Sequence, residues 1–278
     1  MDLRLAAVDL DGTLLRNDLT ISERTRAAIR AATTAGVEVI VVTARSPRSV
    51  REIARAAGVG GRAICANGAT VFDLDRNRIV LHRPLKAEAV QRIVTAWRAR
   101  RPDVVFGWEL GLRFGSEPAY EALRDATSWP RPTGAFRPVD ALEWGRPVTK
   151  LLARSPAVEI EELLDEAREL ARDEAGVTRA GSTFVELMAP GVSKEAALAA
   201  LAERRRLAAA QVVAFGDQLA DAGMLGWAGL GVAVANADPR ALAAADVITL
   251  SNDEDGVAVV LERLLSRGAT RQSARTRP

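Results

Sequence analysis

The sequence contains only one cysteine and one histidine, and this scarcity excludes two kinds of chemistry. Cys65 cannot form an internal disulfide, and a single thiol fits a reducing compartment. We expect Cys65 to be a small buried side chain, because His82 is the only imidazole that could activate it as a nucleophile. Disulfide-stabilised folds and cysteine–histidine catalysis are therefore not expected.

Long apolar runs are also missing. No stretch reaches the ~18 uninterrupted apolar residues that a membrane-spanning helix requires. The opening residues MDLRLAAVDL carry acids within a short apolar run and lack the basic start and cleavage site of a signal peptide. We expect a cytoplasmic protein without a membrane partner.

Basic charge is concentrated at the end of the chain. The formal net charge is +2, but residues 266–278 contain four arginines and no acid. The rest of the chain therefore has a formal net charge of −2. We expect this basic tail to be disordered and solvated. No basic pattern with interleaved aromatic residues occurs elsewhere, so a nucleic-acid partner is not expected.

Two common kinds of ligand loop are absent. The chain contains neither glycine-rich nucleotide-binding motif, which disfavours simple dinucleotide or P-loop binding. Counted from Asp9, the sixth and twelfth positions hold Leu14 and Thr20, not the glycine and glutamate of a calcium-binding EF-hand loop.

The composition is that of an ordinary globular protein, and 278 residues suit two domains. Strand and helix patterns alternate at both ends of the chain, which predicts a parallel α/β sheet. Residues 37–43, VEVIVVT, are typical of a strand covered on both faces. Thr20 and Glu23 have the spacing of a capping box for a helix that ends at Gly36.

The order of predicted elements changes between residues 84 and 189, where runs of strands and two helices replace the strict alternation of strand and helix. The expected fold class is therefore α/β, with a Rossmann-like parallel-sheet core and an inserted α+β domain. The core is predicted to comprise residues 1–83 and 190–265, the insert 84–189, and the tail 266–278.

Two acids stand at the end of the first predicted strand. Side chains two residues apart on a strand point the same way, so Asp9 and Asp11 could converge at its carboxyl end. Open α/β sheets bind ligands at that edge. Paired carboxylates require a cation or a shared proton, whereas a plain Asp-Gly turn would have neither.

Other polar residues favour a functional site over a plain turn. Each lies at the end of a predicted strand or the start of a helix, where backbone N–H groups also attract anions. Together they supply an ammonium, a hydroxyl and several carboxylates, which suits a phosphate with a divalent cation. They are Thr43, Ala44, Arg45, Lys194, Asp217 and Asp221.

With these residues, the chain resembles the haloacid dehalogenase superfamily of phosphatases, specifically the Cof-like branch with a large α/β cap between the second and third signatures. The first signature is Asp9-Leu10-Asp11-Gly12-Thr13, and the others are Thr43, Lys194 in GVSKEAAL, and GDQLADAGML with Asp217 and Asp221. The segments ICANGA and SNDEDGVAVVLERL are also similar to that branch.

The resemblance implies a role for each signature residue. Asp9 would be the nucleophile that becomes an aspartyl phosphate, and Asp11 would be the general acid and base. Thr43 and Lys194 would bind the phosphoryl oxygens. Mg²⁺ would be held by Asp9, the Asp11 main-chain carbonyl and Asp217, while Asp221 would orient Lys194 or a metal-bound water.

The substrate would contact residues beside the signatures and in the cap. We predict Leu10, Ala44, Arg45, Asn67 and Glu186 as substrate-binding residues, with Trp108, Glu109 and Arg113 as further cap candidates. One departure stands out, because Ala220 replaces the asparagine that the branch carries before Asp221. Asn67 could compensate, although Asn-Gly is also typical of a tight turn.

The leading hypothesis is a Mg²⁺-dependent phosphatase that hydrolyses a small phosphorylated metabolite, such as a sugar phosphate, through an aspartyl phosphate. A phosphomutase with the same machinery is an alternative. A non-catalytic binding or regulatory descendant is a third, because of Ala220. The protein is expected to be a monomer or a homodimer.

Overall fold

A computed structural model describes residues 2–123, 146–180 and 184–275. The chain divides into two compact units, which we call the core unit and the cap unit. The core unit comprises Met1–Arg45, Val50–Arg78 and Ser193–Pro278, and the cap unit comprises Ser46–Ser49 and Ile79–Val192. The insert expected at residues 84–189 lies within the cap unit.

The larger sheet has eight strands in the order β13-β12-β11-β1-β2-β3-β4-β5. From β13 to β3 the neighbouring strands are parallel, which confirms the Rossmann-like sheet, and β4 then pairs antiparallel with β3. The last two strands were not predicted. The bounds are β1 (Leu5–Val8), β2 (Glu38–Val42), β3 (Arg62–Cys65), β4 (Thr70–Asp73), β5 (Arg78–His82), β11 (Val212–Gly216), β12 (Leu230–Ala233) and β13 (Val247–Ile248).

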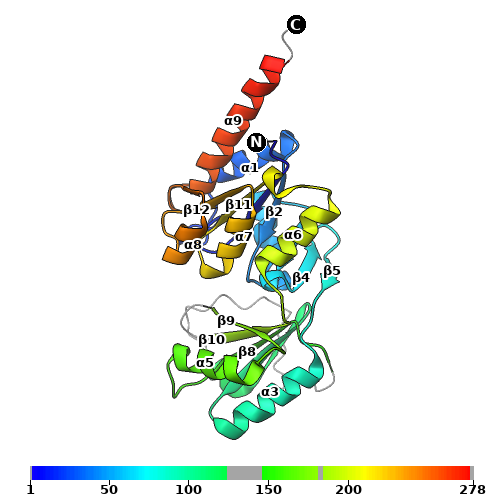
Figure 1. Cartoon of the computed structure of the whole chain (residues 1–278), viewed down its shortest axis with the longest axis vertical. Helices are drawn as coiled ribbons and strands as arrows, with labels where there is room; N and C mark the ends of the chain where they lie inside the picture. Colours follow the sequence, from blue (N-terminus) through cyan, green and yellow to red (C-terminus); the bar gives the residue numbers. More distant parts are fainter. Residues whose placement is uncertain (1, 124–145, 181–183, 276–278) are drawn as a thin grey trace. The chain divides into compact units, whose positions relative to one another are not determined.

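Helices cover both faces of this sheet (Figure 1). Helices α6, α7 and α8 pack side by side on one face, and α1 packs against α9 on the other. All four residues of β1 are fully buried between these layers, as expected for a central parallel strand. The bounds are α1 (Glu23–Thr34), α2 (Pro47–Ala57), α6 (Lys194–Arg204), α7 (Ala222–Trp227), α8 (Pro239–Ala244) and α9 (Gly256–Arg275).

Two local predictions in the core unit need correction. Ser22, not Thr20, caps α1 and accepts the N–H of Thr25, because Thr20 is hydrogen-bonded to Asp18. Helix α9 continues to Arg275, past the predicted start of a disordered tail at residue 266. Residues 266–275 contain no proline to end the helix. The tail residues 276–278 lie outside the described part of the chain. None of the described helices is long and apolar enough to cross a membrane.

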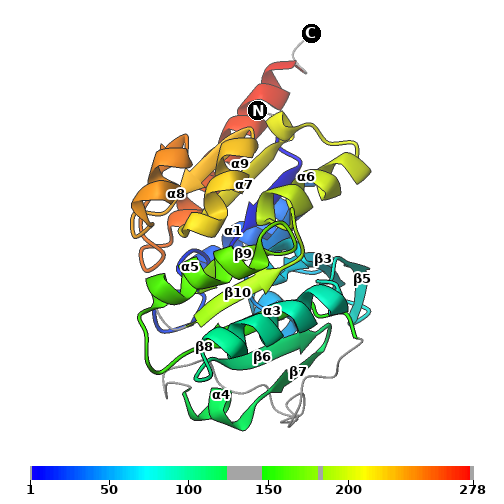
Figure 2. The ribbon, with the colours of Figure 1, turned by 60° about the horizontal axis from the view of Figure 1, so that its bottom comes forward.

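The cap unit contains a five-stranded antiparallel sheet in the order β7-β6-β8-β10-β9. Helices α3 and α5 lie on one face of it (Figure 2), so the insert is α+β as predicted. Short helix α4 (Pro118–Ala122) follows β7. The other bounds are α3 (Ala87–Arg100), β6 (Val105–Leu110), β7 (Arg113–Ser116), β8 (Lys150–Arg154), α5 (Ile160–Ala171), β9 (Gly176–Ala180) and β10 (Phe184–Met188).

Side-chain alternation divides the cap sheet into two faces of different character. Phe106 and Trp108 point to the helices and belong to a continuous apolar core. The alternate residues Glu109, Lys150 and Glu186 therefore lie on the opposite face, which we call the charged face, and they are buried there. A small apolar cluster lies on the charged face as well, formed by Phe114, Tyr120 and Leu152.

Trp97 on α3 is the largest side chain that joins the helices to the cap sheet. It is fully buried, meets Phe106 edge-on with a centroid distance of 5.9 Å, and donates to Glu166 on α5 at 3.0 Å. We expect Trp97→Ala to lower the free energy of unfolding by about 3–5 kcal/mol, because it leaves a cavity in this core. Urea unfolding followed by circular dichroism measures this change. Exposed Glu88→Ala on the same helix is the control, and equal effects of the two variants would contradict the assignment.

Candidate active site

Three adjacent parallel strands bring the signature residues to one edge of the core sheet. Strands β11, β1 and β2 are neighbours, and Asp217, Asp9 and Thr43 come directly after their respective carboxyl ends. The backbone N–H of Asp9 donates to the Phe215 carbonyl at 3.0 Å, which continues the pairing up to this edge. The side chains are at most 3% exposed, so they form a buried polar site.

The loop after β1 turns tightly around the Asp217 carboxylate. Gly12 has a φ of +78°, and a Cβ there would lie 2.4 Å from Asp217 Oδ2. Only glycine suits both the conformation and the space. The next residue, Thr13, donates its hydroxyl to Asp217 Oδ1 at 2.8 Å.

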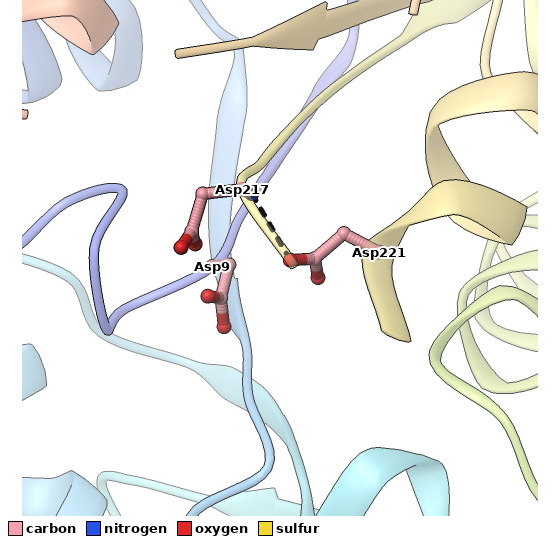
Figure 3. Close-up of side chains that lie close together, drawn as sticks. All are labelled: Asp9, Asp217 and Asp221. Carbon is pink, nitrogen blue, oxygen red and sulfur yellow. Dashed lines mark hydrogen bonds between the residues drawn. The ribbon is translucent and has the colours of Figure 1, made fainter. Parts of the chain in front are cut away.

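The centre of the site is a buried ammonium between two carboxylates. Lys194, the first residue of α6, donates to Asp9 Oδ1 at 2.8 Å and to Asp221 Oδ1 at 2.6 Å. Figure 3 shows Asp9 and Asp217 on neighbouring segments, with Asp221 reaching toward them from the adjoining helical turn. Lys194, Asp9 and Asp221 are each at most 3% exposed, so this pairing is shielded from water.

Burial and like charge dominate the electrostatics. Burial raises the pKa of Asp9 well above its ordinary value, Lys194 opposes this, and Asp221 and Asp217 add to it. Burial also raises the pKa of Asp217, against hydrogen bonds from Gln218 and Thr13. Burial alone would lower the pKa of Lys194, but Asp221 and Asp9 outweigh it and raise that pKa. The site therefore has more negative charge than one lysine can neutralise.

The acidic cluster fits a hard divalent cation. Asp9, Asp217 and Asp221 each offer one oxygen, and these oxygens lie within 4.8 Å of one another. Carboxylate oxygens are the donors that Mg²⁺ prefers, and a cation would relieve the excess charge.

Asp221 is already fully engaged within the protein. Its Oδ1 accepts from Lys194, and its Oδ2 accepts the N–H groups of Asp217 at 3.1 Å and Gln218 at 2.9 Å. These contacts are consistent with the predicted role of Asp221 in orienting Lys194, and its part in metal binding stays a prediction.

Asp11 does not join the acidic cluster. Strand β1 ends at Val8, so the alternation of a strand does not extend to residues 9 and 11. The carboxylate of Asp11 instead accepts a hydrogen bond from Arg45 Nε at 2.8 Å and another from the Arg45 terminal nitrogen Nη2 at 2.6 Å. Burial raises the pKa of Asp11, and Arg45 partly opposes that rise. The pairing occupies the Asp11 side chain, and the main-chain carbonyl of Asp11 stays the predicted metal ligand.

The loop after β2 lies beside this pair. Thr43 is fully buried, and its hydroxyl accepts the N–H of Arg45 at 3.1 Å. Ala44 is partly exposed between them. Asn67 lies in the short turn η1 (Ala66–Gly68), where its N–H donates to the Thr43 carbonyl at 3.0 Å. Asn67 thus lies in a tight turn, and its role in substrate binding stays a prediction.

The remaining predicted substrate residues lie in different settings. Leu10 is fully buried and its carbonyl accepts the Leu15 N–H at 2.8 Å, and its role in substrate binding stays a prediction. Glu186 lies in the cap unit and forms an ion pair with Lys150. Of the other cap candidates, Trp108 is buried in the apolar core of the cap unit, while Glu109 lies on the charged face. The role of Glu186 in substrate binding stays a prediction.

Sequence reasoning missed three side chains that hold the site in place. Thr13 and Gln218 donate to the two oxygens of Asp217, the latter at 2.6 Å. Asn236 donates its amide to the Gly12 carbonyl at 2.8 Å. Thr13 and Gln218 stand within the quoted signatures and could have been found by their neighbours, whereas Asn236 is distant in sequence and gave no signal.

The parallel core sheet and the inserted α+β unit define a two-unit α/β protein with a cluster of buried carboxylates at the edge of its core sheet. A model of the haloacid dehalogenase-like hydrolase family matches residues 6–261. The chain belongs to this family, which confirms the resemblance seen in its signatures.

Individual relatives span nearly the whole chain. The 5-amino-6-(5-phospho-D-ribitylamino)uracil phosphatase YcsE of Bacillus subtilis (strain 168) is 30% identical over 274 residues, covering 93% of this chain and 94% of the relative. The crystal structure of a haloacid dehalogenase-like hydrolase from Bacteroides thetaiotaomicron matches with a TM-score of 0.80 and 27% identity, over 94% of this chain and 99% of that one. A subclass IIB sugar phosphatase, 20% identical, matches with a TM-score of 0.80 over 94% of this chain and 98% of that one, which supports the fold.

The buried ammonium yields a prediction about stability that is independent of catalysis. Lys194→Met leaves Asp9 and Asp221 without their counter-charge, and breaking a buried ion pair typically costs about 3–5 kcal/mol. The carboxylates then have higher pKa values in the folded protein than in the unfolded chain. At pH values between the unfolded and the folded pKa of these carboxylates, the folded state binds more protons than the unfolded chain. The destabilisation therefore grows as pH rises.

The measurement is urea unfolding in the presence of a chelator at several pH values between 5 and 8. The matched control is Lys86→Met, at an exposed lysine. If Lys194→Met were as stable as Lys86→Met at pH 8, the ammonium would not be compensating the cluster.

Proposed function

We propose that this hydrolase is a Mg²⁺-dependent phosphatase that cleaves the phosphate monoester of a small metabolite through an aspartyl phosphate on Asp9. The single observation that carries the proposal is the buried Asp9 carboxylate, bonded to Lys194 and next to Asp217 at the carboxyl edge of the sheet. Such a site brings together a nucleophile, a cationic side chain that can bind phosphate, and additional carboxylates that can bind a metal ion.

Asp9 is the group placed to attack phosphorus. One of its oxygens would form a bond to phosphorus while the bond to the leaving oxygen breaks. Its attachment directly after β1, and its bond to Lys194, hold the carboxylate in a fixed direction. This preorganisation removes much of the entropic cost of aligning the nucleophile.

Asp11 would supply a proton to the leaving oxygen and then take one from the water that attacks the aspartyl phosphate. Its raised pKa favours the protonated form that the first step needs. The ion pair with Arg45 opposes this by favouring the charged form of Asp11. The ion pair must therefore weaken when Asp11 acts as an acid.

The remaining groups would stabilise the phosphoryl oxygens. Lys194 supplies a fixed positive charge, and Thr43 supplies a hydroxyl from the neighbouring strand end. Asp9, Asp217 and the Asp11 main-chain carbonyl would hold Mg²⁺. When bound, the ion would reduce the electrostatic repulsion between the anionic nucleophile and the phosphate.

The relatives support a small metabolite as substrate. One is the uracil-derivative phosphatase YcsE, and another is an HMP-PP phosphatase from Yersinia enterocolitica that is 29% identical over 272 residues. The charged face of the cap sheet, with Glu109, Lys150 and Glu186, suits a polar compound such as a sugar phosphate better than an apolar one. A cytoplasmic location and a monomeric or dimeric state stay predictions.

The proposed nucleophile can be tested directly. A panel of sugar phosphates, nucleotides and p-nitrophenyl phosphate should release inorganic phosphate with Mg²⁺ and none with a chelator. Asp9→Asn should lower kcat by at least about 1,000-fold, because the amide cannot form the intermediate. Asp165→Asn, an exposed acid on α5, should leave kcat unchanged. Isomerised sugar phosphate without released phosphate would favour a phosphomutase, and silence on every substrate would contradict the proposal.

The Arg45–Asp11 pair predicts a shift in pH dependence. Arg45 lowers the pKa of Asp11 against the rise caused by burial, so Arg45→Gln should raise that pKa further. The reaction needs protonated Asp11 first, so the alkaline fall in kcat/KM should move to higher pH. Profiles from pH 5 to 10 measure this, with Arg55→Gln as the exposed control on α2. A shift to lower pH would contradict the assignment of Asp11.

A further inference from the structure

Three consecutive residues in the core unit have left-handed backbone conformations. Ala66, Asn67 and Gly68 have φ values of +51°, +53° and +101°. All three are buried in the turn η1, directly after β3. Residues other than glycine rarely adopt this conformation, and it persists only where the surrounding structure holds it. The contacts of the turn therefore indicate what it is held against.

One side of the turn binds the loop that carries Thr43. The Ala66 N–H donates to the Arg45 carbonyl at 2.8 Å, and the Asn67 N–H donates to the Thr43 carbonyl at 3.0 Å. Both donors belong to residues with left-handed backbone conformations. The carbonyls on both sides of Ala44 are thus fixed by the turn.

The other side of the turn lies against the start of α6. A Cβ at Gly68 would lie 2.2 Å from the Ser193 carbonyl oxygen and 2.8 Å from its carbon. Ser193 is the N-cap of α6, and that same carbonyl accepts the Ala197 N–H at 3.1 Å. The following residue is Lys194, so Gly68 is in contact with the peptide that carries the catalytic ammonium.

We propose that the turn Ala66–Gly68 sets the distance between Thr43 and Lys194, and that Gly68 is the positioning residue of the phosphoryl-binding site. The inference rests on the proposed function, in which these two side chains bind the same phosphoryl group. Gly68 touches neither the substrate nor the reacting atoms. It acts through the Ser193 peptide, which no larger residue can approach as closely.

The chain offers a matched control for the test. Gly36 has a similar left-handed φ of +81°, but a Cβ there would meet nothing within 4 Å. Gly36→Ala and Gly68→Ala therefore carry the same kind of backbone strain, and only Gly68→Ala displaces Ser193. A difference between the two in activity isolates the contact from the strain.

The experiment compares kcat, KM, the inhibition constant of inorganic phosphate and the urea midpoint in the two variants. Gly68→Ala is expected to lower kcat and weaken phosphate inhibition by about tenfold or more, because a displacement of about 1 Å in a catalytic group can cost 100-fold. Gly36→Ala is expected to leave both within twofold. Equal kcat and equal phosphate inhibition in the two variants would overturn the inference.

A second variant covers the case in which Gly68→Ala does not fold. Ala66→Gly adds no atom and removes left-handed strain, but it loosens the turn. It is expected to lower kcat and weaken phosphate inhibition severalfold without lowering the urea midpoint, a combination that a merely structural role does not produce. Unchanged kcat and phosphate inhibition in Ala66→Gly would overturn the inference.

The outcomes also separate this inference from the proposed function. If the wild type hydrolyses phosphate esters and Asp9→Asn does not, the function stands whatever Gly68→Ala does. If the wild type is inactive, calorimetric binding of inorganic phosphate in the presence of Mg²⁺ still decides the inference. Weaker binding in Gly68→Ala than in Gly36→Ala would support it, and equal binding would overturn it.

Discussion

The contact of Lys194 with Asp9 and Asp221 is the interaction on which the rest of the structure depends. The three residues are buried, and they come from the position directly after β1, the start of α6 and the segment after β11. Neither the lysine nor the carboxylates could be buried alone, since an unpaired buried charge is strongly unfavourable. Folding of the core unit therefore requires that all three segments come together, and the same requirement assembles the site.

The order of the strands explains how distant segments meet. Strand β1 lies between β11 and β2, so residues after the first, second and eleventh strands share one edge. The chain between the two halves of the core can then be an insert of any length without disturbing that edge. The candidate site residues are therefore positioned by the core sheet, whereas the polar residues of the cap unit stand on a separate sheet.

The alternation of strand and helix patterns in the sequence predicted the parallel sheet and the insert. The signature motifs predicted that one edge of the sheet would carry Asp9, Thr43, Lys194 and Asp217. They failed where a contact depends on local geometry. The alternation rule placed Asp11 beside Asp9, but β1 had already ended, and the loop turns Asp11 to Arg45. Periodicity also does not reveal which hydroxyl caps a helix or which amide supports a carboxylate, because those partners are set by tertiary contacts.

Ala220 shows why a departure from a signature has to be judged by contacts. Asp217 and Asp221, on either side of it, are held by Thr13, Gln218 and backbone N–H groups, and none of these bonds involves a side chain at position 220. Ala220 is itself exposed. The geometry of the loop is therefore independent of the missing amide. What an asparagine there could add is a hydrogen bond to a ligand, which would affect affinity and rate but not the arrangement of Asp9, Lys194, Asp217 and Asp221.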